Sequence, residues 1–153
     1  AVGYETLRYN TTGGSNTSIG AYSLQANTTG ASNVANGLSA MITNTTGSKN
    51  IAIGHNALRL NTTASFNVAV GYEAGYSNVT GIEMVAVGYE ALYASTATGN
   101  TGLGYKAGRN TTGDDNTFVG AFSGFSNTTG SNNSAFGFNS LNSNSKILYF
   151  LLG

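Results

Sequence analysis

The sequence predicts an all-β repeat solenoid, a parallel β-roll or β-helix built from about nine coils of about 17 residues each. Three observations predict this fold class. One glycine recurs every 16 or 17 residues, a short run of alternating residues precedes most of these glycines, and an Asn-Thr-Thr-Gly turn often separates one run from the next. The repeat glycines are Gly3, Gly20, Gly37, Gly54, Gly71, Gly88, Gly104, Gly120, Gly137 and Gly153.

The run before each glycine has the pattern of a short strand. Residues 51–53 read Ile-Ala-Ile, and residues 68–70 read Val-Ala-Val. Such alternation has the period of a strand that turns one face to a core, and β-branched residues suit a pleated, half-buried surface. We therefore expect one strand directly before each glycine.

A second segment follows each glycine. Its first residue is often aromatic, as at Tyr72 and Tyr89, and its third residue is always small. The small residues are Thr6, Ser23, Ala40, Ala57, Ala74, Ala91, Ala107, Ser123 and Ser140. We expect a second short strand here, with a bend at the glycine. An invariably small position implies the close approach of another backbone or another chain.

The turn closes each coil, and its asparagines are expected to stack. Glycine and asparagine tolerate the positive φ of tight turns, and in-register asparagines can hydrogen-bond along a fibre axis. The predicted turn and ladder positions are Asn10, Asn27, Asn44, Asn61, Asn78, Asn110 and Asn127. A second column runs through Asn16, Asn33, Asn50, Asn67, Asn100, Asn116 and Asn133. The turn asparagines also satisfy Asn-x-(Ser/Thr), so glycan attachment is the alternative reading.

Composition excludes several functions. Charged residues make up 8% of the chain and the net charge is zero, so no electrostatic footprint for nucleic acid exists. No cysteine is present, and no apolar run approaches the length of a membrane span. We expect no nucleic-acid partner, no membrane insertion, no metal and no cofactor. His55 is the only histidine and occupies a tyrosine slot of the repeat, so we expect it to stack there and expect no enzyme.

A single coil of this kind is thin, and its recurrent alanines carry little apolar area. Three chains wrapped around one axis would bury the small-residue face of each chain, so we expect an intertwined homotrimer. The chain starts within a repeat and has no polar cap, so we expect a piece of a longer protein or ends covered by neighbouring subunits. Residues 1–142 form the predicted repeat region, and 143–153 form a last partial coil or a transition.

Three polar sites stand out from the repeat. Asn36 fills a slot otherwise taken by Ile, Val, Leu or Phe. In a trimer three copies would meet near the axis and could hold water or an anion, which makes Asn36 a candidate axial site; the alternative is a locally irregular repeat with the amide in solvent. Glu90 and Lys106 are expected to pair at the surface. Asp114 and Asp115 share one turn, which we interpret as solvated.

The pattern Asn-x-Ala-(Ile/Val)-Gly resembles repeats of known fibres. Residues 50–58, 67–75 and 85–92 match it best. They resemble repeats in phage tail fibres and in the heads of trimeric autotransporter adhesins, although the adhesin heads use shorter repeats. The resemblance implies a trimeric left-handed parallel β-roll outside the cell or on a virion. It implies use as a shaft or as an adhesive head.

These observations favour a structural and adhesive segment of an extracellular or virion fibre. Its partners would be further copies of the chain and a host receptor such as a cell-surface glycan. One alternative is a self-assembling extracellular filament whose subunits stack head to tail. A monomeric ice-binding solenoid is the less favoured alternative, because adjacent threonines such as Thr11 and Thr12 point to different faces and form no Thr-x-Thr array.

Overall fold

The computed structural model describes residues 1–142. Every strand in this part of the chain is three residues long and directly precedes a repeat glycine. The strands are β1 (Thr17–Ile19), β2 (Val34–Asn36), β3 (Ile51–Ile53), β4 (Val68–Val70), β5 (Val85–Val87), β6 (Thr101–Leu103), β7 (Thr117–Val119) and β8 (Ser134–Phe136). The predicted last partial coil, residues 143–153, lies outside the described residues.

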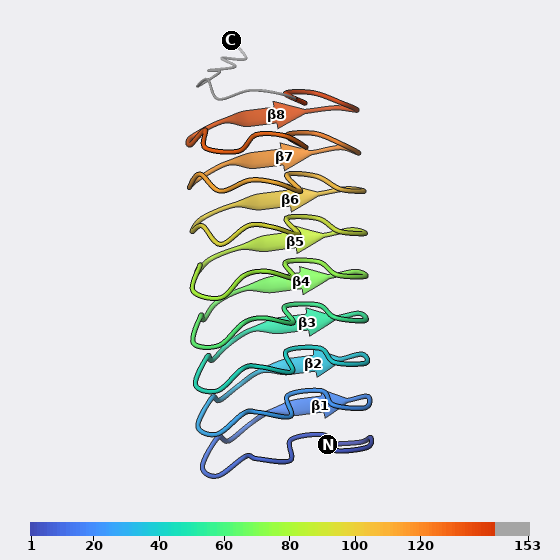
Figure 1. The fold of residues 1–153 in the computed structure, drawn as a ribbon, viewed down its shortest axis with the longest axis vertical. Coiled ribbons are helices and arrows are strands. Elements are labelled where there is room, and N and C mark those ends of the chain that lie inside the picture. The colour runs from blue at the N-terminus through green and yellow to red at the C-terminus, as the bar shows by residue number, and fades with distance from the viewer. Residues whose placement is uncertain (143–153) are drawn as a thin grey trace.

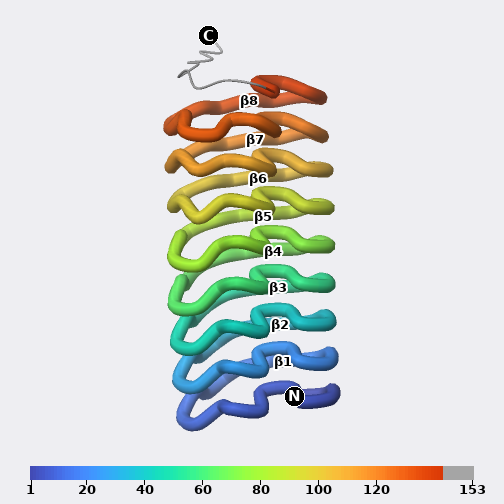
Figure 2. Tube along the Cα trace, viewed as in Figure 1, coloured from blue at the N-terminus to red at the C-terminus, as the bar shows by residue number. Residues whose placement is uncertain are grey.

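The strands form one parallel sheet in the order β1 to β8, so each strand pairs only with the strands of the neighbouring coils (Figure 1). Register is uniform: Ala35 lies opposite Ala52, and Ala52 lies opposite Ala69. Val2 extends the sheet by a single bridge to Ile19. The chain is therefore a regular stack of coils, and the predicted parallel solenoid is confirmed (Figure 2).

Each strand turns its middle residue inward and its two outer residues outward, and in every strand except β7 the middle residue is small. In β3, Ala52 is buried while Ile51 and Ile53 are exposed. The small residues after the glycines, such as Ala57, are buried inside the same coil. The small-residue face therefore has no free surface for another chain, and the packing argument that predicted a trimer from it is wrong.

The second segment of each coil is a chain of turns and not a strand. In the coil that follows Gly54, Asn56 has φ 58° and Leu58 has φ 50°, both in the left-handed region. This backbone bonds to the next coil only at alternate residues, as in Leu58 N–H to Ala74 O (3.0 Å). The prediction of a second strand is wrong because alternating left-handed residues break the continuous ladder.

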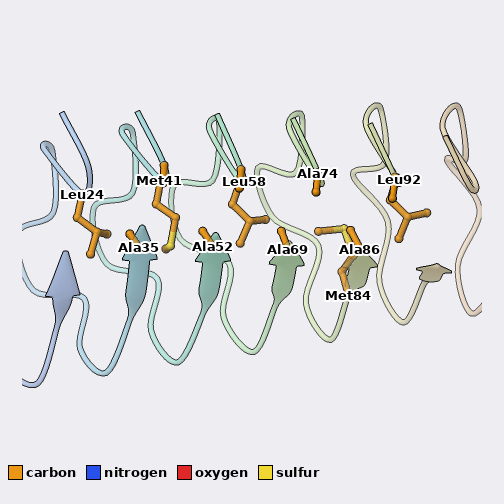
Figure 3. Packing of buried hydrophobic residues seen from close by; sticks show 13 residues of the cluster. Leu24, Ala35, Met41, Ala52, Leu58, Ala69, Ala74, Met84, Ala86 and Leu92 are labelled. Atoms are coloured by element: carbon orange, nitrogen blue, oxygen red, sulfur yellow. The ribbon is translucent and has the colours of Figure 1, made fainter. Parts of the chain in front are cut away.

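A column of large side chains fills the interior opposite the strands. Leu24, Met41, Leu58 and Leu92 are fully buried and contact the strand alanines of the main core cluster (Figure 3). Gly75 interrupts this column, and a Cβ there would collide with the side chain of Met84. Met84 therefore fills the volume that a leucine occupies in other coils.

The same exchange of volume occurs near the last strands. Gly108 and Gly124 take the leucine positions of two successive coils, and Phe118 takes the small middle position of β7. Phe118 is fully buried, and its ring lies where a Cβ on Gly108 would be (2.6 Å from Cδ2). The interior is therefore filled in these coils too, by a large side chain from the strand where the second segment of the coil has glycine.

The repeat glycines form a column of their own, as predicted. Gly20 has φ 115°, and a Cβ there would lie 2.6 Å from the carbonyl oxygen of Gly37. Both the backbone conformation and the close approach of the next coil require glycine. The described members with positive φ are Gly3, Gly20, Gly37, Gly54, Gly71, Gly88, Gly104, Gly120 and Gly137.

Candidate interaction surface

Most of the turn asparagines lie inside the coil, whereas Asn10 in the first coil is exposed. Asn44 Nδ2 donates to Asn27 Oδ1 (2.8 Å) and to Gly47 O (3.0 Å), while its Oδ1 accepts from Asn61 Nδ2 (2.7 Å). The side chain therefore links three coils and closes its own turn. This part of the ladder runs from Asn10 to Asn61, as predicted.

The ladder stops above Asn61. Asn78 holds its own turn by donating to Gly81 O (2.8 Å) and accepting from Gly81 N–H (2.9 Å). Asn61 Oδ1 is consequently buried without a hydrogen-bond partner. Ser95 and then Thr111 take the equivalent positions in the next two coils, and Asn127 resumes the column.

Asn110 does not belong to this column. Thr111 is the buried residue that repeats the backbone bond of the ladder positions, N–H to Gly108 O (3.0 Å), while Asn110 is half-buried and accepts from Arg109 Nη1 (3.2 Å). Every ladder position lies seven residues after a repeat glycine, and Asn110 lies six residues after Gly104. The prediction for Asn110 was wrong because it placed the asparagine of each Asn-Thr-Thr-Gly motif in the column. This coil is one residue shorter within the turn, so its motif is displaced from the column.

The second asparagine column is present and bonds both to backbone and to neighbouring coils. Asn50 N–H donates to Asn33 Oδ1 (3.0 Å), and Asn50 Nδ2 donates to Ala64 O (2.9 Å). Met84 replaces asparagine in this column, and its N–H still donates to Asn67 Oδ1 (2.9 Å). The asparagine content of the chain thus satisfies the backbone of the turns.

Five of the predicted glycan acceptors are fully buried: Asn27, Asn44, Asn61, Asn78 and Asn127. The amide nitrogen of Asn27 donates to Asn10 Oδ1 (2.7 Å) and Gly30 O (2.9 Å), so both its protons are used. Attachment of a glycan would replace one of these protons and would need space beside the nitrogen, but both protons are in hydrogen bonds and the side chain is fully buried. The folded chain therefore cannot carry glycans at the buried positions.

The outward residues of β1 to β8 form a two-column surface that we call the outer sheet face. It carries no charged residue, and most of its members are Val, Ile, Leu, Phe or Thr. Its columns are Thr17, Val34, Ile51, Val68, Val85, Thr101, Thr117 and Ser134, then Ile19, Asn36, Ile53, Val70, Val87, Leu103, Val119 and Phe136. No described part of the chain covers this face, as the exposure of Ile19, Ile53 and Phe136 shows. A contiguous apolar patch of this kind is typical of an interaction surface.

Asn36 lies on the outer sheet face. It is exposed within the single chain, and strand register around it is unbroken, with Ile19 on one side and Ile53 on the other. The locally irregular repeat expected in the alternative is therefore wrong, but the exposure of the amide to solvent that it also expected is present in the single chain. Whether Asn36 holds water or an anion between copies of the chain stays a prediction.

Aromatic and charged residues occupy the segment that returns after each glycine. His55, Tyr72, Tyr89 and Tyr105 form one column of stacked rings, the first ladder, with centroids 5.1 to 5.2 Å apart. The predicted stacking of His55 in a tyrosine column is confirmed, with the rings of His55 and Tyr72 22° from parallel. Tyr76 and Tyr93 form a second ladder (5.0 Å), with Arg59 and Arg109 against its two ends.

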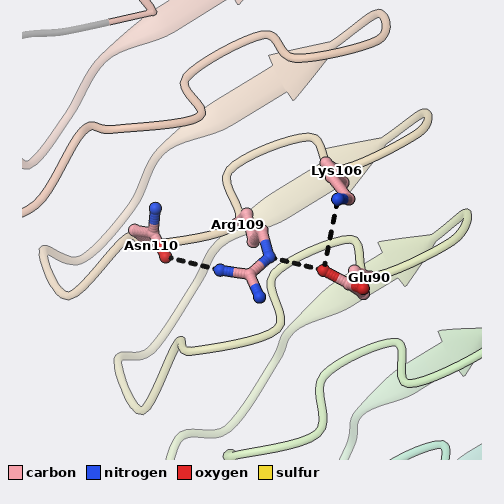
Figure 4. A network of polar contacts seen from close by, with 4 residues as sticks. All are labelled: Glu90, Lys106, Arg109 and Asn110. Atoms are coloured by element: carbon pink, nitrogen blue, oxygen red, sulfur yellow. Dashed lines mark hydrogen bonds and ion pairs between the residues drawn. The ribbon is translucent and has the colours of Figure 1, made fainter.

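Glu90 forms ion pairs with two cations of the next coil, Arg109 and Lys106 (Figure 4). Arg109 Nε donates to Glu90 Oε2 (2.5 Å), and Lys106 Nζ lies 3.8 Å from the same oxygen. The predicted Glu90–Lys106 pair is therefore present, but Arg109 is the closer partner, which sequence reasoning missed. The repeat indicates this pair, because Arg109 occupies the position of Tyr93 one coil later, and Tyr93 is three residues from Glu90.

The environment of Glu90 has opposing effects on its pKa. Burial by itself would raise the pKa of Glu90. Hydrogen bonds from Arg109 and Tyr89, and the positive charges of Arg109 and Lys106, outweigh burial and hold the pKa below its ordinary value of 4.5. The carboxylate is therefore ionised at neutral pH, and it joins the coils of β5 and β6.

A threonine column and Asp114 also make hydrogen bonds between coils. Thr28 Oγ1 donates to Thr45 O (3.1 Å) and Thr45 Oγ1 donates to Thr62 O (3.1 Å), so this threonine column uses its hydroxyls within the chain. Asp114 Oδ1 accepts from Thr98 N–H (2.9 Å). Among residues 1–142, no group of three or more His, Cys, Asp or Glu side chains is placed to hold a metal ion.

Comparisons with known proteins give no relative. No family model matches the chain, and neither a curated protein nor a solved structure is significantly similar to it. Within residues 1–142, the structure has no helix with the length and apolar character needed to cross a membrane.

Proposed function

We propose that the chain is a structural and adhesive segment of an extracellular or virion fibre, in which copies associate through the outer sheet face as a homotrimer. The observation that carries the proposal is the face itself, which is uncharged and uncovered across all eight strands. Moving an apolar face of this kind out of water is favourable, by about 25 cal/mol for each Å² of apolar surface buried.

The outer sheet face is small for an interface. Eight strands spaced about 4.8 Å apart give a strip on the order of 35 Å long and about 10 Å wide. This is well below the roughly 800 Å² per partner of a stable two-chain interface. The number of copies that we propose, three, therefore rests on the resemblance of the repeat to trimeric fibre proteins and not on the area of the face.

Burial of the outer sheet face would leave the return segment, with its tyrosines and charged groups, directed outward. Tyrosine and arginine are enriched at recognition surfaces because each combines a large apolar body with a polar end. The return segment is therefore the surface that we assign to a host receptor such as a cell-surface glycan. With this surface the chain would have an adhesive role beside the structural one.

Sedimentation equilibrium over a range of concentrations tests the proposal. We expect a stable mass three times the 15.6 kDa of the chain. Ile53→Lys places a charge at the middle of the outer sheet face and should give a folded monomer, because burying an unpaired ammonium is costly. Thr46→Lys, on the exposed turn, is the matched control and should remain a trimer.

Three outcomes would contradict the proposal. A wild-type monomer at every concentration would remove self-association through this face. Mass that grows without limit as concentration rises would favour the head-to-tail filament, because that assembly has no closed state. Equal behaviour of Ile53→Lys and Thr46→Lys would show that another surface holds the copies together.

A further inference from the structure

Five tyrosines of the return segment are held in nearly parallel pairs, one coil apart. Tyr72 and Tyr89 have ring centroids 5.1 Å apart and planes 8° from parallel. Tyr89 and Tyr105 are 5.2 Å apart at 12°, and Tyr76 and Tyr93 are 5.0 Å apart at 14°. The spacing follows from the coil repeat of about 4.8 Å, so backbone hydrogen bonds hold each pair in place.

The tyrosine rings of the first ladder are open to solvent, and two of them lie beside carboxylates. Tyr72, Tyr89 and Tyr105 are 42%, 41% and 44% exposed. The negative charge of Glu73 is the main cause that raises the pKa of Tyr72, and a hydrogen bond with Glu90 is the main cause that raises the pKa of Tyr89. A carboxylate in this position can take the phenolic proton when the ring loses an electron.

We propose that the two ladders are sites of oxidative tyrosine cross-linking, in which a carbon–carbon bond joins tyrosines of adjacent coils as dityrosine. Each tyrosine loses one electron and its phenolic proton to give a phenoxyl radical. Two radicals couple at the ring carbons ortho to oxygen, and transfer of the ortho hydrogens restores both phenols. The pair thus loses two protons and two electrons, and a one-electron oxidant receives the electrons.

Such a bond would act as a staple between coils. The chain contains no cysteine, so no disulfide can do this. Coils of a solenoid contact only their neighbours and can separate locally. A bond between residues 16 or 17 apart closes a loop of one coil and restricts the unfolded chain, which stabilises the stack.

The test uses the whole chain at low concentration, oxidised by photoexcited tris(bipyridine)ruthenium(II) with persulfate, which takes two electrons and becomes two sulfate ions. Dityrosine fluorescence reports the reaction, and mass spectrometry of the digest locates the linked peptides by their loss of two hydrogen atoms. We expect links within one chain at Tyr72–Tyr89, Tyr89–Tyr105 and Tyr76–Tyr93.

The chain supplies its own comparison for exposure. Tyr4 and Tyr9 are 66% and 52% exposed, more than any ladder tyrosine. Tyr4 has Tyr22 as its neighbour, but the two rings are edge-on at 87°. Links mainly through Tyr4 or Tyr9, or mainly between separate chains, would show that exposure rather than stacking decides, and would overturn the proposal.

Tyr89→Phe is the informative variant, because phenylalanine keeps the stack but has no phenol. It should abolish both links of the first ladder and leave Tyr76–Tyr93 unchanged, while the circular dichroism spectrum stays that of the wild type. The same oxidation in denaturant should lose the preference for ladder pairs. Equal yields of these pairs from folded and unfolded chain would overturn the proposal.

Discussion

Backbone conformation is the most unusual property of this chain at the residue scale. Among the described residues, 22 residues other than glycine have positive φ between 47° and 63°. The left-handed region costs a residue with a Cβ roughly 1–2 kcal/mol, so interior packing and hydrogen bonds between coils must offset this cost many times over. Where such a side chain makes few contacts, its replacement by glycine should therefore stabilise the fold.

Glu83 is such a position. It is exposed with φ 59°, and the equivalent residue of the next coil is already a glycine, Gly99 (φ 70°). Glu83→Gly should raise the free energy of unfolding by about 1 kcal/mol, because it removes the left-handed strain. Glu83→Ala removes the same carboxylate but keeps the strain, so it is the matched control. Thermal unfolding measures both variants, and equal melting temperatures would contradict the account.

Asn44 is the opposite case, because its side chain makes three hydrogen bonds inside the coil. Asn44→Ala should destabilise the fold by about 3 kcal/mol, since buried partners on Asn27 and Gly47 lose their bonds. Asn10→Ala, at the exposed first position of the same column, should cost clearly less. Chemical denaturation compares the two variants, and a similar loss in both would show that the ladder adds little.

At the scale of the element, columns of side chains and not single residues set the packing. Leucine and strand alanine share the interior of most coils, and where Gly75, Gly108 or Gly124 replaces leucine, Met84 or Phe118 supplies the missing volume. Substitutions in these columns should therefore couple strongly across coils.

Gly75 and Met84 provide the test of this coupling. Gly75→Leu alone should destabilise by about 1–3 kcal/mol, because the leucine overlaps Met84. Adding Met84→Asn removes the overlap and restores the asparagine of the second column, so the double variant should regain much of the loss. A double-mutant cycle of unfolding free energies measures the coupling. Additive effects would contradict the exchange of volume.

The polar network around Glu90 gives a pH dependence at the same scale. Because the folded pKa of Glu90 lies below its ordinary value of 4.5, its stabilising effect is complete above that value and is lost as the pH falls through the folded pKa. The effect should be about 1 kcal/mol, since Arg109 and Lys106 are partly exposed. Melting temperatures from neutral pH to about pH 3 should converge for wild type and Glu90→Gln, and parallel curves would contradict the assignment.

At the scale of the whole molecule, the coils are equivalent units that contact only their neighbours in the sheet. Deleting residues 35–51 joins Val34 to Ala52 and keeps every column in place, so we expect a folded chain one coil shorter. Deleting Ala52 alone removes one strand residue and displaces its neighbours onto the wrong face. Circular dichroism and thermal unfolding should show the long deletion to be the milder one.

The sequence by itself determined the parallel solenoid, the glycine column and most of the asparagine ladder, because these depend on a period that the chain repeats. It also predicted the stacking of His55 and the Glu90–Lys106 pair, since residues one period apart must become neighbours. The position of Asn110 was the exception. The distance from the repeat glycine decides which residue enters the ladder, and a turn that is one residue shorter moves the Asn-Thr-Thr-Gly motif away from that position.

Only the tertiary structure decided which side of each strand faces inward. Alternation allows either face to be buried, and the left-handed turns after each glycine bring the return segment so close that only Ala-sized residues fit between it and most strands. The β-branched residues must then lie outside, which creates the outer sheet face. The same narrow interior explains why Met84 and Phe118 are accepted only where glycine makes room, a dependence between coils that a single period does not reveal.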